Sequence, residues 1–379
     1  MTTRLAVPSG GVSTGDCTST ACTIARAINQ AVAGDTIEMA NGTYSGAFGD
    51  SGMLDFFGKN GSNGSPILVR PATGATVTIR PDATTARAVY FRNCSWIELR
   101  DLIIDGTNLT GEAVKATTVT SGATDILLLR CEIKNATTMG VLTSDDSTAR
   151  LTLRSCTIKD NGTDTNLDHN IYLATSSNIV EDCEISGAAA YGIHLYGSAT
   201  MDNNIFRRNW VHNNGGPGIG IFGGSGNLAY NNVVTANGDL GIRVRSYEVI
   251  DNCGLYNNTV YGNGNWGIYV ENVTPPNITN VHVRNNISYN NTNGQIITNS
   301  VSGTVGNNLT TDPTFVNAAG NDFRIQTSSA AKDMGTSLSG TFTTDKDGIA
   351  RPQGATWDIG AYEFIESSAI TPRLDYRMF

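Results

Sequence analysis

The sequence predicts an all-β chain that winds as a single-stranded right-handed parallel β-helix, a solenoid of roughly ten coils. Three observations predict this fold: a short apolar motif that recurs along the chain, a second apolar segment inside each period, and a column of small and amide side chains. The 379 residues include 42 Gly and only 16% charged residues, a composition typical of a folded chain dense in turns. A solenoid grows along one axis, so this length requires no second core.

The recurring motif is Gly-Ile-x-aliphatic, with Asn in place of Gly in its first copy. Copies begin at positions 170, 192, 218, 241 and 267, which are separated by 22, 26, 23 and 26 residues. Looser copies begin at positions 88, 113 and 140. Short strands that recur at this period, with Gly and Asn at the corners, are typical of a right-handed parallel β-helix. In each copy the two aliphatic residues face the core and the residue between them faces outward.

The second apolar segment of each period includes WIELRDLII at 96–104 and NIFRRNWV at 204–211. Aligning these segments predicts one column of small or polar residues: Asp101, Cys131, Cys156, Cys183, Asn209, Asn232, Asn258, Asn286 and Asn308. Stacked Asn side chains at a strand corner hydrogen-bond along the stack, with about 4.8 Å between coils. We interpret the cysteines as a buried ladder and not a metal site, because no His column joins them.

Three parts make up the chain: an N-terminal segment with a capping helix at 1–35, the solenoid at 36–311, and a C-terminal capping segment and tail at 312–379. The helix is predicted from Ile24, Ile28 and Ala31, which share one helical face and would cover the open first coil. In the C-terminal segment, we expect the Asp and Glu of DIGAYE to make structural hydrogen bonds.

Charge and cysteine content restrict the partners and leave the compartment open. The net charge of −9 argues against nucleic acid or an anionic membrane surface as the main partner. No apolar run is long enough to span a membrane, and the first residues show no signal-peptide core. We expect an extracellular or cell-surface protein, or a virion component, that is a monomer or, if viral, a trimer. Cys17 and Cys22 are close enough in sequence for a disulfide, which the sequence leaves open.

Outward positions of the repeated motif form two columns. The first is Tyr90, Lys115, Leu142, Tyr172, His194, Gly220, Arg243 and Tyr269, and the second is Arg92, Thr117, Ser144, Ala174, Tyr196, Phe222, Arg245 and Glu271. We expect His194 to be exposed on a flat sheet, with a hollow at Gly220 that receives a sugar ring. Aromatic rings beside cations suit a long acidic glycan, so this face predicts a polysaccharide site.

The two ends of the chain resemble known families. The stretch ACTIARAINQAVAGDTIEMANGTYSG at 21–46 resembles the opening of bacterial β-helix proteins of the chondroitinase-B and alginate-lyase kind. The stretches at 312–325 and 345–363 resemble the closing segment of secreted bacterial β-helix proteins. With the coils between them, nearly the whole chain resembles the pectate-lyase-like superfamily. This resemblance implies the fold, whereas the superfamily contains lyases, hydrolases, epimerases, phage depolymerases and noncatalytic members.

Side-chain chemistry favours a lyase that cleaves a uronic-acid glycan by β-elimination. The hypothesis assigns His194 or His169 as the base, Tyr172 or Tyr196 as the acid, and Arg243 with Arg245 as the carboxylate clamp. Lys115 is a further candidate for the base. The substrate-binding residues are predicted as Tyr196, Phe222, Arg245, Trp266, Tyr269, Glu271 and Gly220.

Two alternatives remain open at this point. A glycoside hydrolase needs paired carboxylates, for which Asp145, Asp146, Asp168 and Glu271 are the candidates. A phage-type or noncatalytic glycan-binding β-helix protein needs neither carboxylate pair nor base. No cofactor is certain; the residues predict no metal site, and Ca²⁺ is left open.

Overall fold

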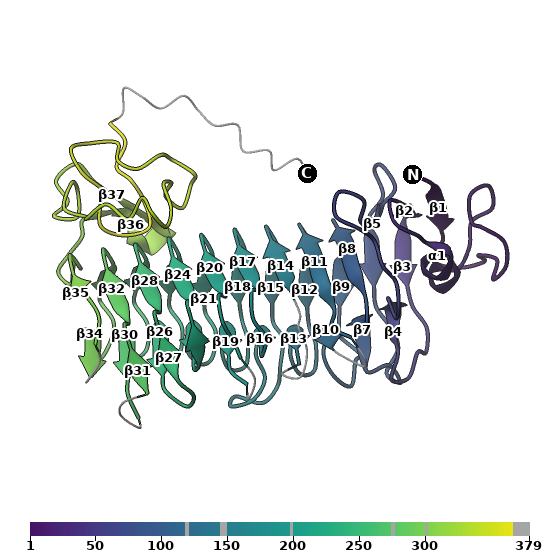
Figure 1. Cartoon of the computed structure of the whole chain (residues 1–379), viewed down its shortest axis with the longest axis horizontal. Helices are drawn as coiled ribbons and strands as arrows, with labels where there is room; N and C mark the ends of the chain where they lie inside the picture. The colour runs from purple at the N-terminus through teal and green to yellow at the C-terminus, as the bar shows by residue number, and fades with distance from the viewer. Residues whose placement is uncertain (118–120, 145–149, 198–199, 274–276, 300–301, 367–379) are drawn as a thin grey trace.

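The computed structural model describes residues 1–117, 121–144, 150–197, 200–273, 277–299 and 302–366. It confirms an all-β, right-handed parallel β-helix whose strands stack along the long axis of the molecule (Figure 1). Most coils contribute one strand to each of three parallel sheets, A, B and C. Within the described residues, sheet A contains 12 strands and sheets B and C contain 10 each.

Sheet A holds the first strand of each period. It comprises β1 (Thr3–Ala6), β2 (Thr36–Met39), β5 (Ile67–Pro71), β8 (Ser95–Arg100), β11 (Thr124–Leu129), β14 (Leu151–Arg154), β17 (Ile179–Glu181), β20 (Ile205–Arg207), β24 (Leu228–Tyr230), β28 (Gly254–Tyr256), β32 (His282–Arg284) and β35 (Val305–Gly306).

Sheet B follows sheet A after one tight corner. It comprises β3 (Gly42–Tyr44), β6 (Val77–Ile79), β9 (Ile103–Asp105), β12 (Glu132–Lys134), β15 (Thr157–Lys159), β18 (Glu184–Ser186), β21 (Trp210–His212), β25 (Val233–Thr235), β29 (Thr259–Tyr261) and β33 (Ile287–Tyr289). The second apolar segment of each period therefore contains two strands, one in sheet A and one in sheet B.

Sheet C contains the recurring Gly-Ile-x-aliphatic motif. It comprises β4 (Gly52–Asp55), β7 (Arg87–Arg92), β10 (Val114–Thr117), β13 (Val141–Thr143), β16 (Ile171–Leu173), β19 (Ile193–Leu195), β22 (Ile219–Ile221), β26 (Ile242–Arg245), β30 (Trp266–Glu271) and β34 (Gly294–Asn299). Two minor sheets complete the fold: β23 (Gly224–Ser225) with β27 (Ile250–Asp251) and β31 (Ile278–Thr279), and the antiparallel pair β36 (Phe315–Asn317) and β37 (Asp322–Ile325).

The corner between sheets A and B carries the predicted asparagine ladder. Asn232 Nδ2 donates to Asn258 Oδ1 at 3.0 Å, and Asn258 Nδ2 repeats this contact with Asn286 Oδ1 at 3.0 Å. The residue before each ladder position adopts a left-handed backbone, such as Asn231 with φ 54° and Asn257 with φ 49°. Asn tolerates the left-handed region better than most other side chains do. Asn is therefore favoured at two adjacent positions of the corner, the left-handed residue and the ladder residue that follows it.

One position of that column is corrected by the strand register. Ile103 pairs with Glu132, so Leu102, and not Asp101, occupies the ladder position beside Cys131. Asp101 is the left-handed corner residue before it, with φ 58°, and it forms an exposed ion pair with Arg130 at 2.6 Å. The one-residue error arises because an Asp is as suitable for the corner as for the ladder.

The solenoid also has two further asparagine ladders that the sequence analysis missed. In the corner after sheet B, Asn214 donates to Asn237 at 2.9 Å and Asn237 donates to Asn263 at 2.9 Å. In the corner before sheet A, Asn178 donates to Asn204 at 2.8 Å. Each ladder satisfies buried backbone groups that a curved, continuous strand would leave without partners.

The N-terminal residues cap the first coil of the solenoid. At the first coil, α1 (Ile24–Gln30) begins after the N-cap Thr23 and buries Ile24 and Ile28, while Ala31 is its buried C-cap. Residues 1–35 also contribute β1 to sheet A, beyond the helix expected there. The Cys17–Cys22 disulfide is present. The expected ladder of buried, unpaired thiols is formed by Cys131, Cys156 and Cys183.

The C-terminal segment, which includes η1 (Ala318–Gly320), lies at the opposite end from α1 (Figure 1). It packs on the outer face of sheet A, where Phe342 stacks on Tyr230 with ring centroids 4.6 Å apart. Glu363 of DIGAYE accepts a hydrogen bond from Arg351 at 2.6 Å, in a pair with no exposed side-chain surface. Asp358 accepts from the backbone N–H of Asp333 at 2.6 Å, so both acids are structural, as predicted.

Candidate functional site on the outer face of sheet C

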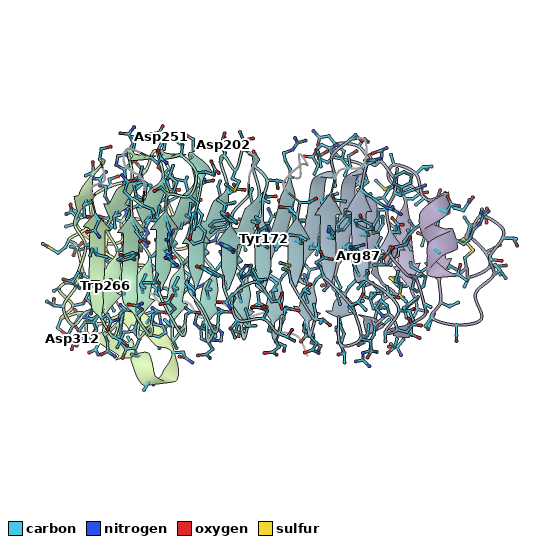
Figure 2. The ribbon with its side chains drawn as sticks, turned by 90° about the horizontal axis from the view of Figure 1, so that it is seen from below. Arg87, Tyr172, Asp202, Asp251, Trp266 and Asp312 are labelled. Carbon is cyan, nitrogen blue, oxygen red and sulfur yellow. A yellow bond between two sulfur atoms is a disulfide. The ribbon has the colours of Figure 1, made fainter. Side chains whose placement is uncertain are left out.

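The strand register confirms the predicted outward columns. Tyr172 is the partner of His194, His194 of Gly220, and Gly220 of Arg243 in successive coils. Figure 2 looks onto this face and shows Arg87, Tyr172 and Trp266 spread along it. The face is therefore continuous over most of the solenoid.

An aromatic–histidine cluster lies at the centre of this face. We define it as His169, Tyr172, Tyr191, His194, Tyr196 and Phe222. His194 stacks on Tyr191 with ring centroids 4.4 Å apart and meets Phe222 edge-on at 4.8 Å. Tyr196 stacks on its other side at 5.6 Å. These contacts leave His194 only 8% exposed, so the expectation of an exposed histidine on a flat sheet is wrong.

The hollow expected at Gly220 is also absent, because the Tyr191 ring occupies it. A Cβ atom on Gly220 would lie 2.9 Å from Tyr191 Cε1 and 3.4 Å from His194 Cδ2. Gly220 therefore provides space for a tyrosine of the protein and not for a sugar. A larger side chain at Gly220 would therefore displace the Tyr191 ring.

A chain of hydrogen bonds links the two histidines of the cluster. The backbone N–H of Tyr191 donates to His169 Nδ1 at 3.2 Å. His169 Nε2 in turn lies 2.9 Å from His194 Nδ1. Both nitrogens of His169 are thus engaged within the protein, and the residue is only 2% exposed.

Three buried side-chain nitrogens of this region make no hydrogen bond to any described residue. Among the described residues, the buried side-chain polar atoms without a hydrogen bond are His194 Nε2, Arg243 Nε, Arg245 Nε and Arg351 Nε. Three of these four belong to the same patch of sheet C. Buried donors are nearly always satisfied in folded proteins, so a concentration of unsatisfied donors indicates a place for an acceptor from outside the chain.

The two arginines are held by one carboxylate. Arg243 Nη2 donates to Glu271 Oε2 at 3.3 Å, and Arg245 Nε lies 3.6 Å from the same oxygen. Arg243 Nη1 also donates to the Tyr191 hydroxyl at 3.3 Å, while its guanidinium lies 5.6 Å from the centroid of Phe222. Glu271 therefore orients both guanidinium groups and neutralises only one of their two charges.

Burial keeps the histidines uncharged. It lowers the pKa of His169 to about 4, against a small opposing effect of the charge on Asp168. Burial also lowers the pKa of His194 well below its usual value, with further lowering from His169 and Arg243. Both rings are therefore neutral at neutral pH, because a buried imidazolium beside an arginine loses hydration and gains repulsion.

Other predicted residues lie apart from the cluster. Lys115 pairs with Glu112 at 3.2 Å, and Leu142 separates it from Tyr172 in the column. Trp266 lies over Gly294, where a Cβ would approach its ring to 2.1 Å. Tyr269 follows Arg243 in the next coil, on the side of the cluster away from His194.

The carboxylates considered for a hydrolase do not form an available pair. Asp168 is buried and accepts hydrogen bonds from the backbone N–H groups of Thr163 and Asp164, at 2.9 and 2.7 Å. Glu271 is engaged by the two arginines. Asp145 and Asp146 lie outside the described residues. Within the described ranges, no group of three or more His, Cys, Asp or Glu residues is placed to hold a metal ion.

Tyr191 is not among the residues predicted for the site, although the sequence contains a signal for it. Tyr191 comes directly before the Gly of its motif copy, and the same position is His169 and Trp266 in other coils. The backbone hydrogen bonds confirm this third column, since Gly140 N donates to His169 O, Asn170 N to Tyr191 O and Gly241 N to Trp266 O. Aligning the residues before each motif would therefore have revealed it.

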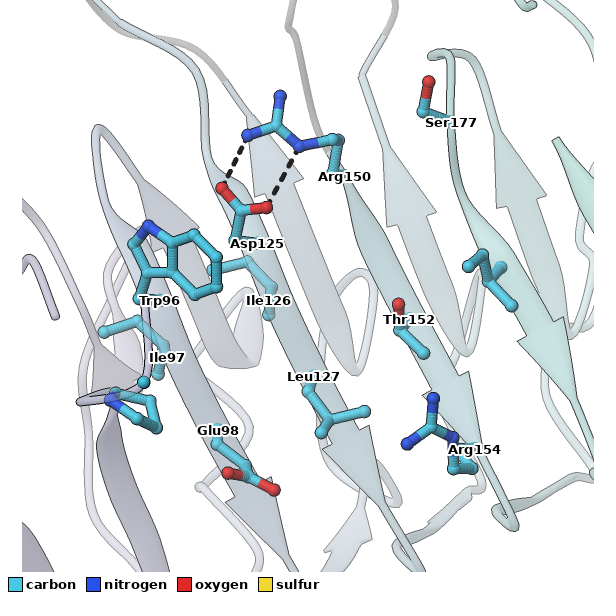
Figure 3. Close-up of a pocket in the computed structure, with 13 residues that line it drawn as sticks. Trp96, Ile97, Glu98, Asp125, Ile126, Leu127, Arg150, Thr152, Arg154 and Ser177 are labelled. Atoms are coloured by element: carbon cyan, nitrogen blue, oxygen red, sulfur yellow. Dashed lines mark hydrogen bonds and ion pairs between the residues drawn. The ribbon is translucent and has the colours of Figure 1, made fainter. Parts of the chain in front are cut away.

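A hollow lies on the outer face of sheet A, with a volume of ≈ 400 Å³ (Figure 3). We call it the sheet A groove; residues that line it include Trp96, Glu98, Asp125, Leu127, Arg150, Thr152 and Ile179. Each charged group that lines it has an ion-pair partner, inside the groove or beside it, and Arg154 pairs with Glu181 at 2.5 Å. Arg150 donates to both oxygens of Asp125, at 3.0 and 2.6 Å, and Arg100 donates to Glu98 at 2.6 Å.

No described helix is long and apolar enough to cross a membrane. The sequence matches the family described as "Right handed beta helix region" over residues 87–246 and 163–320, and the chain belongs to this family. No curated protein is significantly similar to the chain in sequence.

Solved structures share the fold at low sequence identity. The pectate lyase Pel9A has a TM-score of 0.70 and 16% identity, with 96% of each chain covered. A rhamnogalacturonan lyase has a TM-score of 0.57 and 14% identity, covering 83% of this chain and 91% of its own. An alginate lyase from Paenibacillus sp. has a TM-score of 0.50 and 16% identity, covering 80% of this chain and 98% of its own. At these identities the likeness shows the fold alone.

Proposed function

We propose that the chain is a polysaccharide lyase that cleaves a uronic-acid glycan by β-elimination on the outer face of sheet C. The observation that carries this proposal is the group of unsatisfied buried donors on His194, Arg243 and Arg245 beside stacked aromatic rings. The names of the solved structures that share the fold are consistent with it. The partner is an acidic polysaccharide, met outside the cell or at its surface.

The chemistry of elimination suits these donors. A base takes the proton from C5 of the uronate, the C–H electron pair forms the C4=C5 double bond, and the C4–O bond breaks while the leaving oxygen accepts a proton. Negative charge develops on the carboxylate as the C5 proton leaves. Donors already held in a water-poor site stabilise that charge without reorganising.

The residues divide into three roles in this proposal. Arg243 and Arg245, oriented by Glu271, hold the uronate carboxylate. Tyr172, His194 and Tyr196 face the sugar and supply the groups for proton transfer and hydrogen bonding. Phe222 is only 3% exposed, so it supports the Arg243 guanidinium and His194 from beneath and does not stack on a sugar.

The test is the absorbance of unsaturated sugar ends during incubation with alginate, pectate and glycosaminoglycans. A rise with one of these polymers, lost in Arg243→Ala and retained in the matched Arg150→Ala variant of the sheet A groove, supports the lyase. Reducing ends without this absorbance would identify a glycoside hydrolase, and binding without turnover a noncatalytic glycan-binding protein. Either result would replace the proposal.

A further inference from the structure

The hydrogen-bond chain through the two histidines determines where their protons lie. A backbone N–H is always a donor, so His169 Nδ1, which accepts from Tyr191 at 3.2 Å, carries no proton. A neutral imidazole has one proton, which must then be on His169 Nε2. That atom lies 2.9 Å from His194 Nδ1, so His169 donates and His194 accepts. The single proton of a neutral His194 is consequently on Nε2.

The opposite assignment places two donors face to face. A proton on His194 Nδ1 would require His169 to accept at Nε2 and to carry its own proton on Nδ1. That proton would then point at the Tyr191 N–H across 3.2 Å. A second proton on either ring is disfavoured by burial and by the positive charge of Arg243.

We infer that His169 is a positioning residue that locks His194 as a neutral hydrogen-bond donor toward the uronate carboxylate, so that His194 is not the base. This inference rests on the proposed function for the identity of the acceptor. It revises the sequence-based hypothesis that His194 or His169 removes the C5 proton. Proton transfer is then assigned to the phenols that flank His194, Tyr172 at 5.3 Å and Tyr196 at 5.6 Å between ring centroids.

The surroundings of the pair support this state. His194 Nε2 has no hydrogen-bond partner among the described residues, and the residue is more than nine-tenths buried. The charged groups near the pair are Asp168 beside His169 and Arg243 beside His194, and the phenols around them are Tyr172, Tyr191 and Tyr196. Only Asp168 favours a charged histidine, and its carboxylate is already occupied by two backbone N–H groups.

Long-range ¹H–¹⁵N spectra of the full chain labelled with ¹⁵N-histidine test the inference directly, because the sequence contains only 4 histidines. We expect His194 to show the proton on Nε2 at neutral pH. A proton on Nδ1, or a doubly protonated ring, would overturn the inference whatever the activity of the protein.

His169→Phe removes the hydrogen bond and keeps a ring in the same space. We expect His194 to show a mixture of both neutral forms and kcat/KM to fall about tenfold, as when the partner that orients a functional histidine is lost. The matched control is His212→Phe in sheet B, where the histidine contacts Glu184 at 3.3 Å. This substitution should change neither the proton position of His194 nor kcat/KM. An unchanged His194 spectrum in His169→Phe would contradict the lock.

These measurements separate the two proposals. If His194 carries its proton on Nε2 and no lyase activity is found, the role of His169 in fixing that proton is supported and the proposed function fails. If elimination is observed while His194 carries its proton on Nδ1, the lyase stands and the lock fails.

Discussion

The outer faces of sheets C and A are built from the same coils and differ in how their polar groups are satisfied. In the sheet A groove, each arginine named above has a carboxylate partner, such as Asp125 for Arg150. On sheet C, Glu271 forms ion pairs with two arginines, and buried nitrogens of His194, Arg243 and Arg245 make no hydrogen bond within the described residues. The sheet A groove has a volume of ≈ 400 Å³, yet the patch with unsatisfied donors is the better candidate for a site.

The apolar part of sheet A has a structural explanation. Further along the same face, the C-terminal segment covers Tyr230 with Phe342, and Trp357 packs against that ring at 5.1 Å. Half-buried Leu127 and Ile179 in the groove continue the surface on which this segment docks. Sheet A thus joins the C-terminal segment to the solenoid, while the centre of sheet C carries the candidate site.

The largest expected effect is the loss of activity in His194→Phe. Phenylalanine keeps the stacking on Tyr191 and Tyr196 but removes the Nε2 donor. Loss of one donor to a developing oxyanion costs about 100- to 1000-fold in kcat. We expect this loss together with a lower melting temperature, because the buried His169 Nε2 also loses its hydrogen-bond acceptor. The control is Trp96→Phe in the sheet A groove, which should leave kcat unchanged. Equal losses of kcat in both variants would contradict the assignment of the site to sheet C.

A second prediction uses the pH dependence of stability. The pKa of His169 is about 4 in the folded chain and about 6.5 when unfolded. Acid therefore favours the unfolded chain, and the contribution of His169 to stability, full above pH 6.5, is lost as the pH falls toward 4. At about pH 4.5 the loss is about 2 kcal/mol.

The measurement is the difference in unfolding midpoint between the wild type and His169→Phe at neutral and acidic pH. Burial raises the pKa of Asp345 and Asp358 to about 6, which favours the folded chain as the pH falls from 6. Both proteins share these two groups, so the difference isolates the histidine. A difference that does not change with pH would show that His169 is not held neutral.

The third prediction concerns Gly220→Leu, which forces Tyr191 and His194 apart. Overpacking of this kind costs about 1 to 3 kcal/mol of stability, and the displaced rings should also weaken glycan binding. Thr152→Leu adds a similar side chain to the outer face of sheet A and should change stability by less than about 0.5 kcal/mol. Thermal melting of both variants checks this, and equal melting temperatures would mean that the Tyr191 ring moves away without cost.

The smallest expected effect is that of Asp125→Asn in the sheet A groove. Arg150 is 52% exposed, so breaking this ion pair should cost about 0 to 1 kcal/mol and leave glycan turnover unchanged. Chemical unfolding at low and high salt checks the first expectation, because screening should remove most of the difference. A loss of turnover would instead assign the sheet A groove to the site.

Much of the fold follows from the sequence because a solenoid repeats its local rules. The alternation of side chains in Gly-Ile-x-aliphatic determines which residues face outward, and the coils stack in register. His194, Gly220 and Arg243 are therefore partners in successive coils, as predicted. The predicted ladder was wrong at Asp101, because two adjacent corner positions accept the same residue type there. Asn ladders in the other corners were missed because single amides in variable loops show no hydrophobic period.

The sequence by itself determined the coil, the register and the outward columns, because these depend on a period of two along each strand and on one repeat per coil. Only the tertiary structure decided that Tyr191 fills the space above Gly220, that His169 contacts His194, and that His194 is buried. These contacts join residues that precede one strand to side chains of the neighbouring strands. Their geometry depends on backbone turns and ring orientations that no repeat in the sequence encodes.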